Sequence, residues 1–225
     1  MLLIFDLDDT LYEELTFVKS GFIAVANYLA KKYNLNKKDI FSKCLYLLNT
    51  IGRGKIFDVV LKEYNIFSKN ELKKCIYLYR YHKPKIKLYE DAKFFLKKFN
   101  KEQLLIVTDG NKLVQRNKFK ALKLYNYVKK AYFTRQYGIK YEKPSPYVFL
   151  KISNIEKIEP NKIIYFGDNP YKDFFGIKPL GFKTIRIKRG VFSNVCLSNE
   201  FEAHLTFNNF NEINKIVLFN LINQS

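Results

Sequence analysis

The stretch IFDLDDTLYEE, residues 4–14, constrains this chain most, because it places three aspartates within four residues directly after the apolar run LLIF. The whole chain carries a formal net charge of +19, so a cluster of three acidic residues is unusual in it. Carboxylates at such spacing repel one another and are costly to desolvate. Two interpretations are open at this point: the cluster is a solvated turn, or a cation binds there.

Short apolar runs alternate with helix-like segments from about residue 86 onward. The expected strands are LLIF at the N-terminus, then QLLIVT, KAYFT, NKIIYF and FKTIRI, with HLTF as a possible edge strand. The expected helices are EDAKFFLKKF, KLVQRNKFKALKL, SPYVFLKIS, the short YKDFFGI and the closing NEINKIVLFNLI. This alternation indicates an α/β fold, a Rossmann-like doubly wound parallel sheet with helices on both faces.

Between the first strand and that region the sequence pattern is helical. Val18, Phe22, Val25 and Leu29 recur at steps of four, three and four, which places them on one face of a helix. The pattern continues through DIFSKCLYLLN, IFDVVLKEYNI and NELKKCIYLYRYH. We therefore predict an α/β core domain built from residues 1–13 and 86–225, interrupted by a helical domain of residues 14–85.

Composition limits the partners and the location that we expect. The basic residues are scattered as pairs and singles with no basic block and no nucleic-acid motif, so an anionic small molecule is favoured over nucleic acid. The run MLLIF is far shorter than a signal peptide, and no run approaches the roughly 18 apolar residues of a membrane span. Three widely spaced cysteines without a CxxC pair fit reduced thiols, and thus a cytoplasmic protein with no membrane partner.

Polar residues follow the predicted strands at the edge where open parallel sheets bind their ligands. They are DLDDT at residues 6–10, TDG at 108–110, KP at 143–144 and GDNPYKD at 167–173. In this order the chain resembles the haloacid dehalogenase superfamily, whose pattern is DxDxT, a threonine after the second core strand, a lysine, and GDx4D. The resemblance covers the chain apart from residues 14–85, which are similar in length and place to the helical cap of the phosphatase branch.

The resemblance implies a magnesium-dependent phosphatase. Asp6 is expected to be the nucleophile that forms an aspartyl-phosphate, and Asp8 the general acid and base. Asp6, the backbone carbonyl of Asp8 and the side chain of Asp168 are expected to bind Mg²⁺, a hard cation that suits carboxylates. Asp9 is expected to be a solvated loop carboxylate. Because dehalogenases and phosphonate-cleaving relatives have no aspartate at the position of Asp8, phosphoryl transfer is favoured.

The same resemblance assigns the phosphate contacts. The hydroxyl of Thr108 and the backbone N–H of Asp109 are expected to bind the phosphate, and Lys143 to neutralise both the phosphate and Asp6. Most relatives have asparagine where Asp109 stands, and we expect the change to be tolerated because the backbone does most of the binding there. Asp173 is expected to hold a water on the metal. Taken singly, each could instead be a strand-end threonine, a surface lysine or a helix carboxylate.

The helical insertion is expected to carry substrate specificity, because caps of this family close over the site. In NTIGRGKIFD, Arg53 and Lys55 lie in a loop that suits an anionic or hydroxylated substrate. An exposed basic turn between two helices explains the same residues equally well.

The function that we expect is hydrolysis of a small anionic phosphorylated metabolite. One alternative is a sugar-phosphate mutase of the β-phosphoglucomutase type, which uses the same residues but returns the phosphoryl group to its substrate. Another is a catalytically weak relative that binds nucleic acid or a partner protein, although the presence of both Asp6 and Asp8 argues against it.

Overall fold

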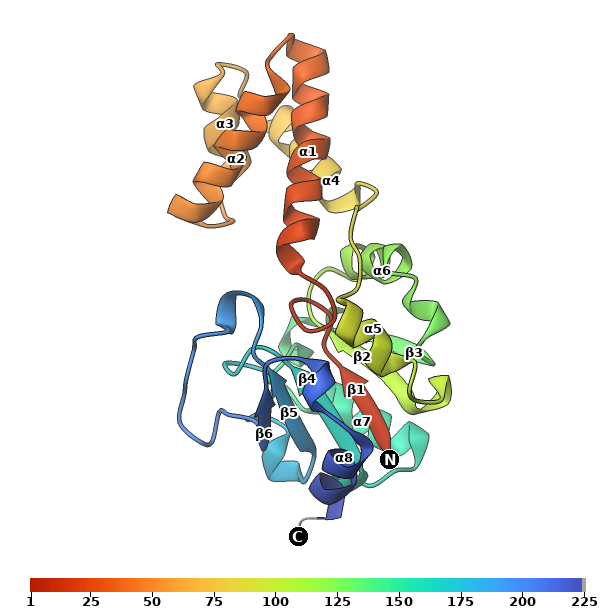
Figure 1. Ribbon diagram of the computed structural model, residues 1–225. Coiled ribbons are helices and arrows are strands. Elements are labelled where there is room, and N and C mark those ends of the chain that lie inside the picture. The colour runs from red at the N-terminus through yellow and green to blue at the C-terminus, as the bar shows by residue number, and fades with distance from the viewer. Residues whose placement is uncertain (224–225) are drawn as a thin grey trace. The chain divides into compact units, whose positions relative to one another are not determined.

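The structure of the protein is a computed structural model that describes residues 1–223. The chain forms two compact units (Figure 1). The α/β unit comprises Met1–Glu14 and Lys87–Ser225, and the helical unit comprises Leu15–Ile86. The helical unit is thus inserted between the first strand of the α/β unit and the remainder of that unit.

Within the described residues, the α/β unit contains one six-stranded sheet whose neighbouring strands all run parallel. The strands are β1 (Leu2–Phe5), β2 (Leu104–Thr108), β3 (Lys130–Phe133), β4 (Ile163–Gly167), β5 (Lys183–Ile187) and β6 (Leu205–Phe207). Their order, β3-β2-β1-β4-β5-β6, is that of a Rossmann-like sheet. Figure 1 shows β1, in red, between β2 and β4, which come from distant parts of the chain. The predicted fold class and the HLTF edge strand are confirmed.

Both faces of this sheet are buried, which explains why its central strands are continuously apolar. The helices of this unit are α5 (Glu90–Leu96), α6 (Lys112–Ala121), α7 (Tyr147–Glu156) and α8 (Lys215–Asn223). Ile4 belongs to a core cluster that includes Phe149 of α7. Its neighbour Phe5 points to the opposite face, where its ring lies 4.7 Å from that of Phe166 and 6.2 Å from that of Phe95 in α5.

The helical unit folds around its own apolar core. Its helices are α1 (Glu14–Tyr33), α2 (Lys37–Ile51), α3 (Ile56–Glu63) and α4 (Lys69–Tyr81), all in the segment with helical sequence pattern. Phe22 and Leu29 of α1 pack in one cluster with side chains from the other three helices. Among residues 1–223, none of the helices combines the length and the apolar character needed to cross a membrane.

The predicted short helix in YKDFFGI, residues 171–177, is wrong, because this segment forms successive turns. Two features oppose a helix there. The carboxylate of Asp173 accepts a hydrogen bond from the backbone N–H of Asn169 at 2.9 Å, a local bond that competes with helical pairing. Gly176 also approaches the loop at Pro144 so closely that a Cβ would lie 1.8 Å from the Pro144 carbonyl oxygen.

Candidate active site

The carboxyl ends of the central strands bring the sequence motifs together. Asp6 directly follows β1, Thr108 ends β2, and Asp168 directly follows β4. Phe5 is in register with both Ile106 of β2 and Phe166 of β4, so the three strands end side by side. Because β1 is central in the sheet, Asp6 lies between the residues contributed by its two neighbours.

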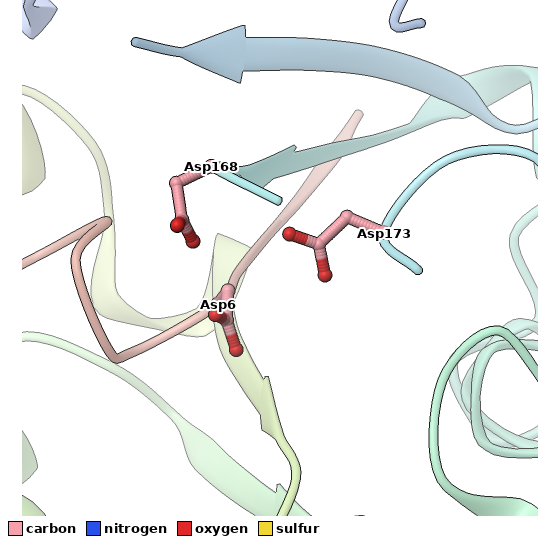
Figure 2. A group of neighbouring side chains, drawn as sticks. All are labelled: Asp6, Asp168 and Asp173. Atoms are coloured by element: carbon pink, nitrogen blue, oxygen red, sulfur yellow. The ribbon is translucent and has the colours of Figure 1, made fainter. Parts of the chain in front are cut away.

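Three buried carboxylates converge at this edge of the sheet. Figure 2 shows Asp6, Asp168 and Asp173 arranged around a common space, and one carboxylate oxygen from each lies within 4.8 Å of the others. Their exposed fractions are only 3%, 4% and 1%. Carboxylate oxygens are hard donors of the kind that divalent cations prefer, so this acidic group is suited to a metal ion.

The electrostatics of the group also favour a cation. Burial raises the pKa of Asp6 to about 7, an effect that Lys143 opposes and that the charge of Asp173 reinforces. Burial, followed by the charges of Asp173 and Asp6, raises the pKa of Asp168 well above its usual range. Without a cation, these groups take up protons to relieve their mutual repulsion; a divalent ion would relieve it instead.

Lys143 is fully engaged within the site. Its ammonium donates to Asp6 Oδ1 at 2.7 Å, to Asp173 Oδ1 at 2.7 Å and to the hydroxyl of Tyr165 at 2.8 Å. Although burial disfavours its charge, Asp173 and Asp6 hold the pKa of Lys143 well above its usual range. With its second oxygen bound to the Asn169 N–H, Asp173 uses both carboxylate oxygens to position other protein groups.

Asp8 is held by three donors on one side of the site. Lys118 Nζ donates to its Oδ1 at 2.7 Å, Gln115 Nε2 donates to its Oδ2 at 2.8 Å, and the Tyr12 hydroxyl also donates to Oδ1. Burial alone would raise the pKa of Asp8. The charge of Lys118 and these hydrogen bonds outweigh burial and hold that pKa below its usual range.

The expectation that Asp9 is a solvated loop carboxylate is wrong. Asp9 is buried, with 6% of its surface exposed, and its Oδ1 accepts a hydrogen bond from the backbone N–H of Glu14 at 2.9 Å. Its φ of 53° lies in the left-handed region, which aspartate tolerates better than most residues. The turn also lies against Gly190, where an added Cβ would meet the Asp9 carboxylate at 2.2 Å, so the loop after β5 covers this side chain.

Thr108 and Asp109 are tied to several elements by side-chain hydrogen bonds. The Thr108 hydroxyl accepts from Gln115 Nε2 at 3.0 Å. Asp109 Oδ1 accepts from the Thr134 hydroxyl at 2.8 Å and from the Lys143 backbone N–H at 3.1 Å. Its Oδ2 accepts from Lys172 Nζ at 3.2 Å. Burial raises the pKa of Asp109, but Lys143 and Lys172 bring it below its usual range.

Gln115, Lys118, Lys172 and Thr134 are site residues that sequence reasoning missed. A signal exists for two of them: Leu122 is buried, and it follows Gln115 by seven residues and Lys118 by four, so all three fall on one helical face. Two polar residues on the buried face of a helix indicate a polar function for that face. Lys172 lies at a variable position of the motif GDNPYKD, and Thr134 ends the predicted strand KAYFT. Neither position by itself indicates a role in the site, because the proximity of both residues to Asp109 arises only in the folded chain.

Arg53 and Lys55 lie apart from this group in sequence and belong to the helical unit. Both are exposed in the loop between α2 and α3, where Gly52 has a φ of 71°. Their proposed contact with substrate therefore stays a prediction.

The chain belongs to the family of haloacid dehalogenase-like hydrolases, because the model of that family matches residues 3–187. This match spans the helical unit as well as strands β1 to β5, and it includes every core site residue described above. The predicted superfamily and the assignment to a hydrolase family are confirmed.

Curated relatives match a smaller part of the chain. Over 92 residues the chain is 33% identical to the glyceraldehyde 3-phosphate phosphatase of Pyrococcus furiosus, which covers 41% of this chain and 38% of that protein. The match to the enzyme of the same name from Methanopyrus kandleri is 28% over 89 residues, covering 40% of this chain and 37% of that protein. The chain thus spans about two fifths of the length of the curated relatives it matches.

Solved structures agree with the fold over nearly the whole chain. A 2-haloacid dehalogenase from Pseudomonas syringae superposes with a TM-score of 0.63 at 18% identity, covering 94% of this chain and 95% of that chain. A haloacid dehalogenase-type phosphatase from Thermococcus onnurineus superposes with a TM-score of 0.60 at 22% identity, covering 96% and 97%. At such identities the likeness shows the fold alone. The two structures with this fold are a dehalogenase and a phosphatase, so the fold is compatible with either reaction.

Proposed function

We propose that this protein is a Mg²⁺-dependent phosphatase that hydrolyses a small phosphorylated metabolite through an aspartyl-phosphate on Asp6. The observation that carries the proposal is the contact of the buried Asp6 carboxylate with the Lys143 ammonium at 2.7 Å, beside the acidic group of Asp168 and Asp173. A nucleophilic carboxylate approaching a phosphate dianion needs this kind of positive surrounding.

The donor set supports Mg²⁺ as the ion. Asp6, Asp168 and the backbone carbonyl of Asp8 would hold it, while both oxygens of Asp173 already accept hydrogen bonds from protein donors. When bound, the ion would neutralise the phosphate and the clustered carboxylates, so that an anionic nucleophile can reach phosphorus. The raised pKa values of Asp6 and Asp168 support the same conclusion, because they reflect negative charge that the protein alone leaves incompletely balanced.

In the first step a carboxylate oxygen of Asp6 attacks phosphorus, and the bond from phosphorus to the leaving oxygen breaks. Asp8 gives a proton to that oxygen, so that the products are an alcohol and a phosphorylated Asp6. Asp8 must therefore carry a proton at this stage. The approach of a phosphate dianion supports that state, because a nearby negative charge raises the pKa of a carboxyl group.

In the second step water attacks the phosphorus of phosphorylated Asp6. The carboxylate of Asp8 now takes a proton from the water, and the bond between Asp6 and phosphorus breaks. Inorganic phosphate leaves, and both carboxyl groups return to their starting states. In both steps the Thr108 hydroxyl would bind a phosphate oxygen, and the positive charge of Lys143 would attract the phosphate.

Asp8 supports phosphate hydrolysis over dehalogenation. The fold is shared with a dehalogenase and with a phosphatase, so fold cannot separate the two reactions. Cleaving a phosphate ester requires a proton for the leaving oxygen, and Asp8 is a carboxyl group two residues from the nucleophile that can supply it. A departing halide needs no such proton.

The names of the curated relatives and the formal net charge of +19 both favour a small anionic phosphorylated substrate. Glyceraldehyde 3-phosphate is the first compound to test, because enzymes named for its hydrolysis match about two fifths of this chain. We further propose that residues 14–85 act as a cap whose loop residues Arg53 and Lys55 contact the rest of the substrate. A cytoplasmic location remains the prediction made from the cysteines.

The decisive experiment measures inorganic phosphate released from glyceraldehyde 3-phosphate, other sugar phosphates, nucleotides and small phospho-acids. Each is tested with Mg²⁺ and with EDTA, for the wild type and for Asp6→Asn. We expect release by the wild type with Mg²⁺ only, and a loss of at least about a thousandfold in Asp6→Asn, which removes the nucleophile.

The matched control is Asp58→Asn, which makes the same chemical change in α3 of the helical unit and should leave phosphate release unchanged. Circular dichroism of both variants establishes that the fold is intact. Activity retained by folded Asp6→Asn would rule out the aspartyl-phosphate route. Turnover that appears only with a phosphorylated activator, and with little release of inorganic phosphate, would point to the mutase instead.

A further inference from the structure

Helix α6 presents two buried polar side chains toward the proposed site. Gln115 and Lys118 each expose only 4% of their surface, although α6 is otherwise a surface helix with mostly polar residues. Burying an amide and an ammonium is costly unless their partners make up for the lost water. Their partners are the residues that the proposed reaction uses, Asp8 and Thr108.

The Gln115 amide contacts three acceptors at once. Its Nε2 lies 2.8 Å from Asp8 Oδ2, 3.0 Å from Thr108 Oγ and 2.6 Å from the Asp109 carbonyl oxygen. A carboxylate and a carbonyl can only accept, so the NH₂ end of the amide must face them. Among the described residues, Gln115 Oε1 has no hydrogen-bond partner, so this orientation persists despite a buried acceptor left unpaired.

This contact positions the Thr108 hydroxyl. The Gln115 NH₂ group has two hydrogens for three acceptors, so Asp8 Oδ2, Thr108 Oγ and the Asp109 carbonyl oxygen share them. A Thr108 oxygen that accepts one of these hydrogens keeps its own hydrogen for another acceptor. A phosphate oxygen is such an acceptor, so the contact with Gln115 suits the hydroxyl to phosphate binding.

Lys118 acts on the other oxygen of Asp8. Its Nζ lies 2.7 Å from Asp8 Oδ1 and 3.9 Å from Glu14 Oε1. Asp8 Oδ1 also accepts a hydrogen bond from the Tyr12 hydroxyl. Gln115 and Lys118 together grip both oxygens of Asp8 from a single helix. The Asp8 side chain is therefore held by α6 as well as by Tyr12 of its own loop.

We propose that Gln115 and Lys118 are a positioning pair for phosphoryl transfer: Gln115 orients the Thr108 hydroxyl toward phosphate, and Lys118 holds the Asp8 side chain in place. The proposal rests on the proposed function for the role of Asp8. Its phosphate-binding part can be tested without turnover. The partners of both residues are Asp8 and Thr108 rather than the phosphorus or the leaving group, so both act through those two side chains.

The test compares Gln115→Leu, Lys118→Met and the conservative Lys118→Arg with the wild type. Steady-state kinetics with the best substrate give kcat and KM, and calorimetry with inorganic phosphate and Mg²⁺ gives phosphate affinity. Lys120→Met is the matched control, since it removes a lysine from the exposed side of the same helix. Thermal unfolding of every variant separates loss of fold from loss of function.

For Gln115→Leu we expect KM and the dissociation constant of inorganic phosphate both to rise by about tenfold, as for one lost hydrogen bond to a charged group. For Lys118→Met we expect kcat to fall by about tenfold at nearly unchanged KM, with most of the loss recovered in Lys118→Arg. Lys120→Met should match the wild type in every measurement. If the two residues had a purely structural role, both variants would lower the unfolding temperature and the fraction of active protein. They would not separate into one variant that changes KM and one that changes kcat.

Folded Gln115→Leu with wild-type phosphate affinity would overturn the role given to Gln115. Lys118→Met with wild-type kcat would overturn the role given to Lys118, and the phosphatase function would stand in both cases. If the wild type releases no phosphate from any substrate, the proposed function fails and the role of Lys118 in turnover fails with it. The phosphate affinities of wild type and Gln115→Leu then still decide the role of Gln115.

Discussion

Asp109 adds a negative charge beside the proposed phosphate position, where the resemblance to the family leads us to expect asparagine. Lys172 offsets that charge, because its Nζ lies 3.2 Å from Asp109 Oδ2 and its pKa is raised by the surrounding carboxylates against the effect of burial. Thr134 and the Lys143 backbone occupy the other oxygen. The negative charge of Asp109 and the positive charge of Lys172 thus compensate each other.

Removing Lys172 alone should therefore harm phosphate binding. We expect Lys172→Met to raise KM by about tenfold, because only Lys143 then offsets the charge of Asp109 beside the phosphate. Asp109→Asn in the Lys172→Met background should recover most of that loss, so the two effects should not add. Steady-state kinetics on the two single variants, the double variant and the control Lys120→Met would check this; additive losses would show that the residues act independently.

At the scale of elements, the end of β4 depends on a residue without a side chain. A Cβ on Gly167 would lie 2.4 Å from Asp173 Oδ2, closer than two such atoms can approach. The small residue lets Asp173 fold back over the strand end, where it accepts from the Asn169 N–H and from Lys143. The Asp173 carboxylate thus joins the end of β4, the turn at Asn169 and Lys143.

Gly167→Ala should disrupt this junction. We expect a loss of about 1–3 kcal/mol in the free energy of unfolding, since the methyl group must displace Asp173 or the backbone. Activity should fall more than stability alone explains, because Lys143 loses one of its anchors. The control is Gly54→Ala in the helical unit, where nothing lies within 4 Å of the added Cβ. Denaturant unfolding of both variants measures the difference, and equal stabilities would contradict the crowding argument.

At the scale of the whole molecule, the acidic group couples metal binding to stability. The folded state holds the pKa of Asp6 at about 7, against 3.8 for an unperturbed aspartate, and that of Asp168 is raised as well. Between pH 3.8 and about 7 the folded chain keeps a proton on Asp6 that the unfolded chain has lost. The stability that Asp6 contributes is therefore fully present below pH 3.8 and is lost as the pH rises through about 7. The raised pKa of Asp168 acts in the same direction.

A divalent cation should restore that stability where the protons have left. We expect Mg²⁺ to raise the unfolding temperature more at about pH 7.5 than at about pH 5.5, because at the lower pH it competes with bound protons. Thermal unfolding with Mg²⁺ and with EDTA at both pH values measures this. Asp168→Asn should remove most of the Mg²⁺ effect, while Asp58→Asn should keep it. An equal gain at both pH values would contradict the proton-linked mechanism.

Local sequence signals were sufficient for most of the fold. The continuous apolar runs identify buried parallel strands, and the spacing of Val18, Phe22, Val25 and Leu29 identifies α1, because each signal depends on the chain's own periodicity. The predicted helix in residues 171–177 failed for the opposite reason. Its backbone is shaped by the contact of Gly176 with Pro144, which no local pattern reveals, and by the hydrogen bond between Asn169 and Asp173, which apolar periodicity does not reveal.

The sequence by itself determined the class of the molecule, because the succession of strands, the order of the motifs and the carboxylates after β1, β2 and β4 are properties of the linear chain. Only the tertiary structure decided which polar side chains share the site. Gln115 and Lys118 reach Asp8 from more than a hundred residues away, and Lys172 reaches Asp109 across 63 residues. It also decided that Asp9 is buried rather than solvated. Such pairings follow from how the parallel strands bring distant loops to one edge, and that geometry exists only once the sheet has formed.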